Sequence, residues 1–276
     1  MATAFHSEDV LERIAEALDA AACTLKPFVP GSVKAEYKSG DDPVTEADRA
    51  VNRVLHQILL RDGEGWLSEE SVDDRSRLGR DRIWIVDPLD GTREFVSGIP
   101  EWCVSIAFVE KGVASAAGIA NPVTGETFLG SIERGVTYNG KAAQTSRRQS
   151  LAGAVVLASR SEVKRGEWKA FESSPFSLHP MGSVAYKLAR VAAGLADATW
   201  TLTPKHEWDV AAGVALVEAA GGFVSTLADG PARFNNESAL LPGLIAGGAG
   251  LRAGIFSFLR PRLDVSAMSA QPGHPG

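Results

Sequence analysis

The sequence has few cysteines, no long apolar run and no excess of positive charge. Cys23 and Cys103 stand far apart with no C-x-x-C pair, which disfavours a disulfide framework and a zinc site built on thiolates. No run approaches the ~18 apolar residues of a membrane span, and the N-terminus lacks the pattern of a signal peptide. The net charge of −6, from 28 basic and 34 acidic side chains, argues against a nucleic-acid-binding surface. We therefore expect a soluble, cytoplasmic protein without nucleic-acid or membrane partners.

What is present is the composition of an ordinary globular protein, with 45% hydrophobic and 22% charged residues. The 276 residues suffice for one large domain or two modest ones, with a sizeable core. Apolar residues recurring at helical spacing predict helices at 8–28 and 46–61. Thr45 stands at the cap position of the second helix, and Asp48 follows three residues later, as in a variant of the capping box.

Short apolar runs and turn signals predict a β-rich stretch, and strands and helices alternate after it. The predicted elements are a buried strand (82–86), an antiparallel meander (103–140), two later strands (154–159 and 197–203) and two later helices (183–193 and 208–220). One more strand and one more helix are expected at "LIAG" (244–247) and "LRAGIFSFL" (251–259). A polar, irregular segment near residue 145 predicts a subdomain boundary. The expected parts are an N-terminal α+β half (1–145), a C-terminal α/β half (146–262) and a disordered Pro/Gly-rich tail (263–276).

The stretch "WIVDPLDGT" (84–92) places two acids at the end of the predicted buried strand. Pro88 stiffens the turn after the strand, so Asp90 is expected close to Asp87. Two carboxylates that close repel each other unless a cation lies between them, and hard oxygen ligands suit magnesium. If a short helix starts at Gly91 and Thr92, their amides can bind phosphate. A tight turn with no ligand is an equally good interpretation of this stretch alone.

Other acids could complete such a site, although each has a simpler explanation. Glu69 and Glu70 end the short apolar run "GWLSEES", and adjacent glutamates are most often a solvated surface pair. Asp209 lies in the first turn of a predicted helix, where acids are common. Small residues follow it, which indicates a helix packed close to a neighbour. Asp48 could serve only as the capping partner of Thr45.

Five motifs together resemble the inositol monophosphatase superfamily, which includes 3′(2′),5′-bisphosphate nucleotidases and, more distantly, fructose-1,6-bisphosphatases. They are "DPVTEAD" (42–48), "SEES" (68–71), "WIVDPLDGT" (84–92), "GSVAYKLA" (182–189) and "EWDVAAG…VEAAGG" (207–222). They stand in the family's order and span most of the chain, so the joint signal is strong although each motif is weak. The resemblance implies a layered αβαβα sandwich and a phosphomonoesterase that uses two or three Mg²⁺ ions, often as a lithium-sensitive homodimer.

The resemblance also implies roles for individual residues, most of them in the N-terminal half. The implied metal ligands are Glu69, Asp87, the carbonyl of Leu89, Asp90 and Asp209. Asp48 and Thr92 resemble the pair that orients and deprotonates the attacking water, with Glu70 as a neighbour that supports catalysis. The amides of Gly91 and Thr92 would hold the phosphate.

The resemblance implies a small phosphorylated metabolite as the substrate, but the sequence indicates its identity less well. Leu202 occupies the position where animal inositol monophosphatases carry an acid, and "DGTREF" and "EWD" look more like bacterial bisphosphate nucleotidases. Arg93, Ser183, Lys205 and His206 are the candidate substrate contacts, although Lys205 and His206 are at even odds with a solvated loop. These features slightly favour 3′-phosphoadenosine 5′-phosphate over inositol 1-phosphate, and a broad sugar-phosphate phosphatase stays open.

Three other classes are disfavoured. A haloacid-dehalogenase-type phosphatase needs D-x-D after an apolar strand, and the acids here are spaced D-x-x-D. An inactive metal-binding relative would lack a ligand or the water-activating pair, and all are present. An unrelated α/β binding domain with acidic turns does not explain five motifs in order.

Overall fold

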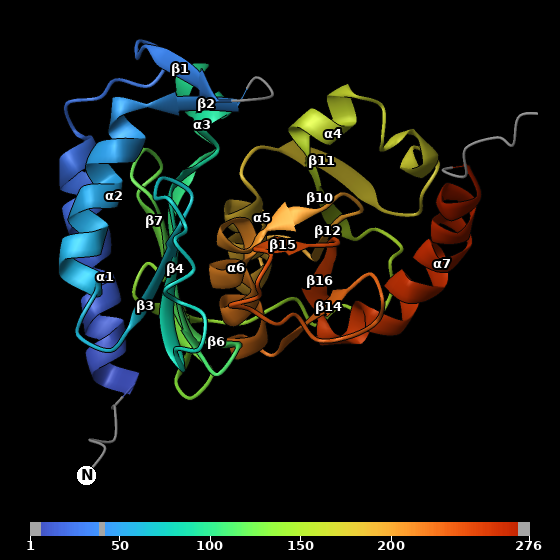
Figure 1. Ribbon diagram of the computed structural model, residues 1–276. Coiled ribbons are helices and arrows are strands. Elements are labelled where there is room, and N and C mark those ends of the chain that lie inside the picture. The colour runs from blue at the N-terminus through green and yellow to red at the C-terminus, as the bar shows by residue number, and fades with distance from the viewer. Residues whose placement is uncertain (1–6, 39–41, 270–276) are drawn as a thin grey trace, which may run out of the picture.

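The computed structural model describes residues 7–38 and 42–269, and these form a five-layered αβαβα sandwich (Figure 1). Helices α1 (Ser7–Leu25) and α2 (Glu46–Leu59) cover the outer face of a seven-stranded sheet. Helices α5 (Val184–Ala192) and α6 (Glu207–Ala219) lie between that sheet and a five-stranded one. Helix α7 (Arg252–Ser269) covers the far face of the second sheet. The expected fold class is confirmed.

The first sheet runs in chain order, from β3 to β9, so the predicted meander is confirmed. Its strands are β3 (Gly65–Ser68), β4 (Arg82–Asp90), β5 (Cys103–Glu110), β6 (Val113–Asn121), β7 (Glu126–Ser131), β8 (Gly135–Tyr138) and β9 (Lys141–Ala143). β3 and β4 are parallel and the other neighbours antiparallel. The central strands are apolar on both sides because helices cover both faces.

The second sheet has the order β11-β10-β12-β16-β14, with parallel pairs at the β11 side and antiparallel pairs at the other. Its strands are β10 (Val155–Ser159), β11 (Ser177–Met181), β12 (Ala198–Thr201), β14 (Gly222–Thr226) and β16 (Leu244–Gly248). The other elements are β1 (Ala35–Lys38), β2 (Asp42–Thr45), α3 (Thr92–Val96), α4 (Arg160–Lys164), β13 (Lys205–His206), β15 (Leu240–Leu241) and the 3₁₀ helices η1 (Lys169–Phe171) and η2 (Ala249–Leu251).

Helix α2 starts at the predicted capping box. The hydroxyl of Thr45 accepts a hydrogen bond from the Ala47 amide, and the Asp48 carboxylate accepts one from the Thr45 amide at 2.8 Å. Val51 and Leu55 are buried one turn apart on the same side of the helix. Both the cap and the apolar stripe are local features, so this helix was predictable from its own sequence.

Helices α5 and α6 pack closely because Gly213 has no side chain. A Cβ atom at Gly213 would lie 2.3 Å from the Cβ of Leu188, closer than real contacts allow. The small residues after Asp209 therefore serve a close helix–helix approach, as the sequence indicated. Both helices come from the C-terminal half yet share one apolar core with β5 and β6 of the N-terminal half. The two halves are thus joined by a common core.

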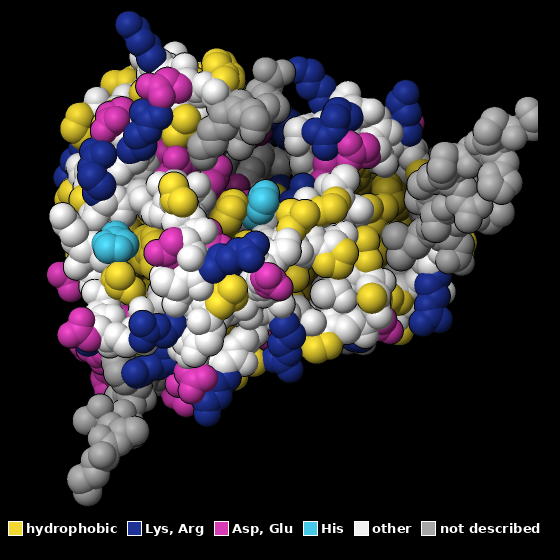
Figure 2. Space-filling view, viewed as in Figure 1, with side chains coloured by type: hydrophobic (Ala, Val, Ile, Leu, Met, Phe, Trp, Pro, Cys, Tyr) yellow, Lys and Arg dark blue, Asp and Glu magenta, His cyan; other side chains and the backbone are white. Residues whose placement is uncertain are grey.

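The boundary proposed near residue 145 falls between β9 and β10, where the chain passes from one sheet to the other. The tail proposed to be disordered is helical over its first part, since α7 continues to Ser269, and 270–276 lie outside the described residues. Among the described helices, none has both the length and the apolarity needed to cross a membrane. Basic and acidic side chains are interspersed over the face shown in Figure 2.

Candidate active site

A bulge in β4 turns both aspartates of "WIVDPLDGT" to the same face of the sheet. Asp87 pairs with Ser105 and Asp90 pairs with Cys103, so three steps on β4 match two steps on β5. Residues two apart on β5 share a face, and their partners must share it too. Without the bulge, residues three apart would point to opposite faces. Cys103 packs toward α5 and α6, so both carboxylates face those helices.

Gly91 lies between the end of β4 and the start of α3, and its backbone is in a left-handed conformation with φ of +99°. A Cβ atom there would lie 2.9 Å from the Glu101 carbonyl oxygen and 3.0 Å from the Cβ of Trp102. Glycine is therefore needed for both its φ angle and its lack of a side chain. The expected short helix begins at Thr92, and no side chain caps its first turn. The Gly91 and Thr92 backbone thus stays open to the pocket described below.

The start of α5 holds Asp90 in place. Its carboxylate accepts hydrogen bonds from the Ser183 hydroxyl and the Ala185 amide, both at 2.6 Å. The Ser183 hydroxyl also accepts one from the Tyr186 amide at 3.0 Å, and so caps α5. Ser183 was a candidate substrate contact, but its hydroxyl is already engaged with Asp90 and the helix.

Asp209 is placed by the start of α6. Its carboxylate accepts a hydrogen bond from the His206 amide at 2.9 Å, so Asp209 does support the helix start, which is the simpler explanation of an acid at this position. The His206 ring stacks flat on Trp208, with centroids 4.4 Å apart and planes 7° from parallel. Both rings and the Asp209 carboxylate line the same pocket. The stacked rings of His206 and Trp208 form an aromatic surface at the rim of this pocket.

These elements enclose a cavity of about 240 Å³ that collects most of the predicted site residues. The predicted residues in its lining are Glu69, Asp87, Leu89, Asp90, Gly91, Thr92, Arg93, Ser183, Lys205, His206 and Asp209. They come from both halves of the chain and from segments more than 100 residues apart. We refer to it as the acidic pocket.

The acids of this pocket repel one another. Burial raises the pKa of Asp87 well above its usual range, and the nearby charges of Glu69, Asp90 and Asp209 raise it further. Burial also raises the pKa values of Asp90 and Asp209. Clustered, buried carboxylates of this kind are a donor set suited to a hard divalent cation. Within the described residues, no three acidic, histidine or cysteine side chains stand close enough together to hold one ion at once.

Asp48 and Thr92 are in contact, as the resemblance implied, although their helices are far apart in the chain. The Thr92 hydroxyl lies 3.1 Å from an oxygen of Asp48 and 3.0 Å from the Leu89 carbonyl oxygen, so it can donate to either. Burial raises the pKa of Asp48, and the charge of Glu70 adds to this effect. Thr92 lines the acidic pocket, whereas Asp48, which is 1% exposed, reaches it through Thr92.

Lys187 is a pocket residue that the sequence motifs did not indicate as part of the site. It lies one turn after Ser183 on the same side of α5, and burial lowers its pKa to about 8. Its ammonium donates to the Ser183 carbonyl oxygen at 2.8 Å. The sequence could have indicated Lys187, because a residue four positions after the helix cap Ser183 lies on the same face of the helix as the cap. Arg160, also missed, lines the pocket from α4 and pairs with Glu101 at 2.6 Å.

The predicted substrate contacts Lys205 and Arg93 also line the pocket, and Lys205 has a partner. Its ammonium lies 3.1 Å from Glu162, which is 2% exposed and also accepts hydrogen bonds from Trp168 and Thr201. Leu202, thought relevant to substrate choice, packs against the apolar cluster between the second sheet and α7. The position that carries an acid in animal inositol monophosphatases therefore faces a core here.

The Inositol monophosphatase family model matches residues 7–253. The chain belongs to this family. An inositol-1-monophosphatase of Rhizobium meliloti is 33% identical over 208 residues, or 72% of this chain and 77% of that protein. Nus factor SuhB of Pseudomonas aeruginosa is 33% identical over 210 residues, or 70% and 75%. The structure of the Thermotoga maritima IMPase superposes with a TM-score of 0.79 at 27% identity, covering 93% and 98% of the two chains.

Membership of the inositol monophosphatase family makes this chain a metal-dependent phosphoric monoester hydrolase. The family acts on small phosphorylated substrates, in agreement with a pocket of this size. The acids, the open turn at Gly91 and the Asp48–Thr92 contact are the features of this chain that such chemistry would use.

Proposed function

We propose that this protein is a magnesium-dependent phosphomonoesterase for a small metabolite with a second anionic group, with 3′-phosphoadenosine 5′-phosphate favoured. The observation that carries the choice is the presence of Lys187 and Lys205 in the same pocket as the acids and the Gly91–Thr92 turn. One phosphate would lie at the turn and the second near the lysines, since ammonium groups bind phosphate as point charges. The cavity of about 240 Å³ is small for a nucleotide, so the base would extend over the rim onto Trp208 and His206.

The carboxylates of Glu69, Asp87, Asp90 and Asp209, with the Leu89 carbonyl, would hold the magnesium ions. When bound, such ions make water a stronger acid and stabilise charge on the phosphoryl and leaving oxygens. Their positive charge would also relieve the repulsion that raises the pKa of Asp87.

The remaining steps belong to the chain's own residues. The Gly91 and Thr92 amides bind phosphoryl oxygens and orient the phosphorus for in-line attack by water. The Thr92 hydroxyl accepts a hydrogen bond from that water while donating its own proton to Asp48. The water proton passes through this pair, and the raised pKa of Asp48 suits a group that must accept one. No phosphorylated enzyme is formed.

Inositol 1-phosphate is the second candidate, and a relative named inositol-1-monophosphatase supports it. A single phosphate on a compact ring would fit the cavity without reaching the rim. Against it, Leu202 offers no carboxylate to the ring hydroxyls and packs into a core. A broad sugar-phosphate phosphatase would use the same turn and acids without either lysine.

A substrate panel separates these candidates. Phosphate release from 3′-phosphoadenosine 5′-phosphate, 3′-AMP, inositol 1-phosphate and fructose 1,6-bisphosphate is compared by kcat/KM. If the proposal is right, the bisphosphate nucleotide has the highest value. Lys205→Gln should lower kcat/KM for that substrate about tenfold and for 3′-AMP by less than about twofold. Lys164→Gln, an exposed change outside the pocket, is the matched control.

Inositol 1-phosphate as the best substrate would overturn the nucleotide assignment while leaving the phosphatase intact. Equal loss on both nucleotides in Lys205→Gln would show that Lys205 supports the fold through Glu162 instead. Absence of turnover on all four compounds would favour the inactive metal-binding relative.

A further inference from the structure

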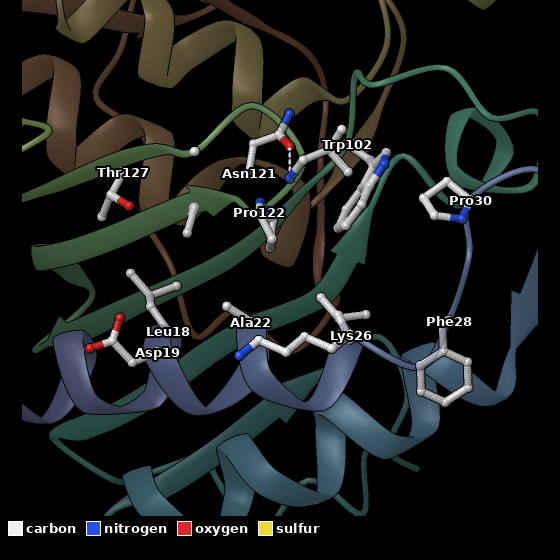
Figure 3. A pocket seen from close by; sticks show the side chains of 14 residues that line it. Leu18, Asp19, Ala22, Lys26, Phe28, Pro30, Trp102, Asn121, Pro122 and Thr127 are labelled. Atoms are coloured by element: carbon white, nitrogen blue, oxygen red, sulfur yellow. Dashed lines mark hydrogen bonds between the residues drawn. The ribbon is translucent and has the colours of Figure 1, made fainter.

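A second cavity, of about 420 Å³, lies on the α1 side of the first sheet (Figure 3), whereas the acidic pocket lies on the side of α5 and α6. Its walls are the second half of α1, the loop that follows it, Trp102 before β5 and the turn between β6 and β7. We call it the α1 cavity. Its volume is in the range of small-molecule sites. None of the proposed catalytic residues lines it.

The lining of the α1 cavity favours a flat apolar ligand with a single anionic group. Leu18 and Ala22 form its floor on α1, and the rings of Trp102 and Phe28 stand at one end (Figure 3). Lys26 extends along the helix over this floor and contributes the one cation of the lining. The lining's carboxylate, on Asp19, lies two helical turns before Lys26, about 10 Å along the axis. The Lys26 side chain extends back along α1 in the direction of Asp19 (Figure 3), so its ammonium lies between that carboxylate and the aromatic end of the cavity.

One wall of the α1 cavity touches the helix that carries Thr92. The Trp102 ring packs edge-on against Phe95 of α3, with centroids 4.9 Å apart. Its backbone lies directly against Gly91, as the 3.1 Å approach of an added Cβ to the Trp102 Cα shows. The Trp102 indole N–H is buried without an acceptor among the described residues. Packing alone holds this ring, so moving it breaks no hydrogen bond.

The opposite wall touches the same helix. The loop after α1 passes Phe28 and Pro30, and the Gly31 amide then donates to the Phe95 carbonyl oxygen at 2.9 Å. Gly31 also packs against Gly98, just after α3, where an added Cβ would lie 3.3 Å from the Gly98 Cα. A molecule between these two walls would therefore bear on Phe95 from both sides.

We propose that the α1 cavity is an effector site for a small aromatic anion, and that its occupation lowers turnover. The ligand displaces Trp102 and the Gly31 loop, and both displace α3. Thr92 then loses its alignment with Asp48, while the phosphate turn and the lysines keep most of their substrate contacts. The effect falls on kcat more than on KM.

The test uses 1-anilinonaphthalene-8-sulfonate, an aromatic body with one sulfonate that fluoresces in apolar sites. We expect saturable binding with one dye per chain, unaffected by saturating inorganic phosphate. Ala22→Phe, which fills the floor of the cavity, should weaken dye binding about tenfold or more. Cys23→Phe adds the same side chain at an exposed position outside the lining and should leave it unchanged. Lys26→Ala, which keeps the cavity's shape, should weaken it about threefold or more.

Activity is measured in parallel with p-nitrophenyl phosphate. The dye should lower kcat of the wild type about fivefold, the lower end of coupling between two sites, with KM changed less than about twofold. Ala22→Phe should keep its own kcat and become insensitive to the dye. Thermal unfolding of each variant confirms that it is folded.

Displacement of the dye by phosphate, or equal dye binding by Ala22→Phe and the wild type, would overturn the site. Binding in the cavity with unchanged kcat would overturn its effector role. Because the binding measurements need no turnover, they test whether the α1 cavity binds an aromatic anion even if the proposed phosphatase substrate is wrong.

Discussion

At the scale of single residues, the site depends on carboxylates held where they repel one another. Asp87 and Asp90 share a face only because of the bulge between them, and Ser183 and Ala185 hold Asp90 in one orientation. Such a cluster destabilises the folded chain by itself, because burial disfavours each charge. Function and stability therefore pull in opposite directions at these positions.

Asp90→Asn should lower phosphate release by about a hundredfold or more, because the site loses a charged ligand that is also fixed by α5. Ser183→Ala is the matched variant: it keeps the charge but loses the 2.6 Å hydrogen bond, and we expect a loss of about tenfold. Initial rates at saturating magnesium decide this. Near-wild-type turnover in Asp90→Asn would refute the assignment of Asp90.

Asp87→Asn should stabilise the chelated protein while it abolishes activity. Because the folded-state pKa of Asp87 is raised, its ionisation removes stability as the pH rises from the ordinary carboxyl range through the folded pKa. At pH 8 in EDTA the neutral amide avoids this cost, and the melting temperature should rise by about 2 °C or more.

Asp73→Asn is the control, and at this position we expect the opposite change in melting temperature. The hydrogen bond from Arg77 lowers the pKa of Asp73, so this group stabilises the fold above the ordinary carboxyl pKa and the stabilisation is lost on acidification. The amide should therefore lower the melting temperature at pH 8. A fall in both variants would show that repulsion does not dominate at Asp87.

At the scale of elements, two helix starts from the C-terminal half place Ser183 and Asp209 opposite the end of β4. Their spacing depends on the contact of α5 with α6 at Gly213, where there is no room for a side chain. The distance between the carboxylates of Asp90 and Asp209 thus depends on a glycine that lies outside the pocket.

Gly213→Ala should destabilise the protein by about 1–3 kcal/mol, the usual cost of overpacking a core, and should also raise the magnesium concentration needed for half-maximal activity. Urea unfolding and magnesium titration measure the two effects. Gly230→Ala is the control, since an added Cβ there approaches nothing closer than 3.7 Å. An unchanged magnesium requirement in Gly213→Ala would show that the spacing of α5 and α6 does not affect metal binding.

At the scale of the whole molecule, the acidic pocket draws residues from both halves, which already share a core with α5 and α6. Ions bound there would together draw on acids from β4, from α6 and from the residue after β3, and they would stabilise the folded state by mass action. The Arg77 side chain, fully buried, makes a further link through Asn235 at 2.8 Å.

Magnesium at about 100 times its Kd should raise the free energy of unfolding by about 2.7 kcal/mol over the chelated protein. Chemical unfolding with and without EDTA measures the difference, and potassium chloride at equal ionic strength controls for screening. EDTA should also abolish phosphate release. Activity that persists in EDTA would contradict the magnesium assignment.

Lithium should inhibit at millimolar concentrations when magnesium is limiting, because a small monovalent cation can occupy oxygen ligands without supplying the second charge. Phosphate release is followed while lithium chloride replaces sodium chloride. An identical rate in the two salts would count against a family-like metal site.

Local features of the sequence determined much of this protein. The apolar stripe of α2 follows from helical periodicity, and the cap of α2, the turns of the meander and the glycines that end α6 follow from cap and turn chemistry, which act over a few residues. The five motifs in order identified the family and nominated the acids. The helical start of the expected tail was missed, because a Pro/Gly-rich end obscures the helix before it.

Only the tertiary structure decided what those residues face. The bulge that aligns Asp87 with Asp90 depends on pairing with β5, and the engagement of Ser183 with Asp90 depends on α5 packing 93 residues away. Tertiary packing also explains why Lys187, which was not predicted, lines the pocket. It likewise explains why Leu202 packs against an apolar core and does not line the pocket. The direction of a side chain is set by which strand or helix packs against it, and such contacts join segments whose separation along the chain carries no local signal.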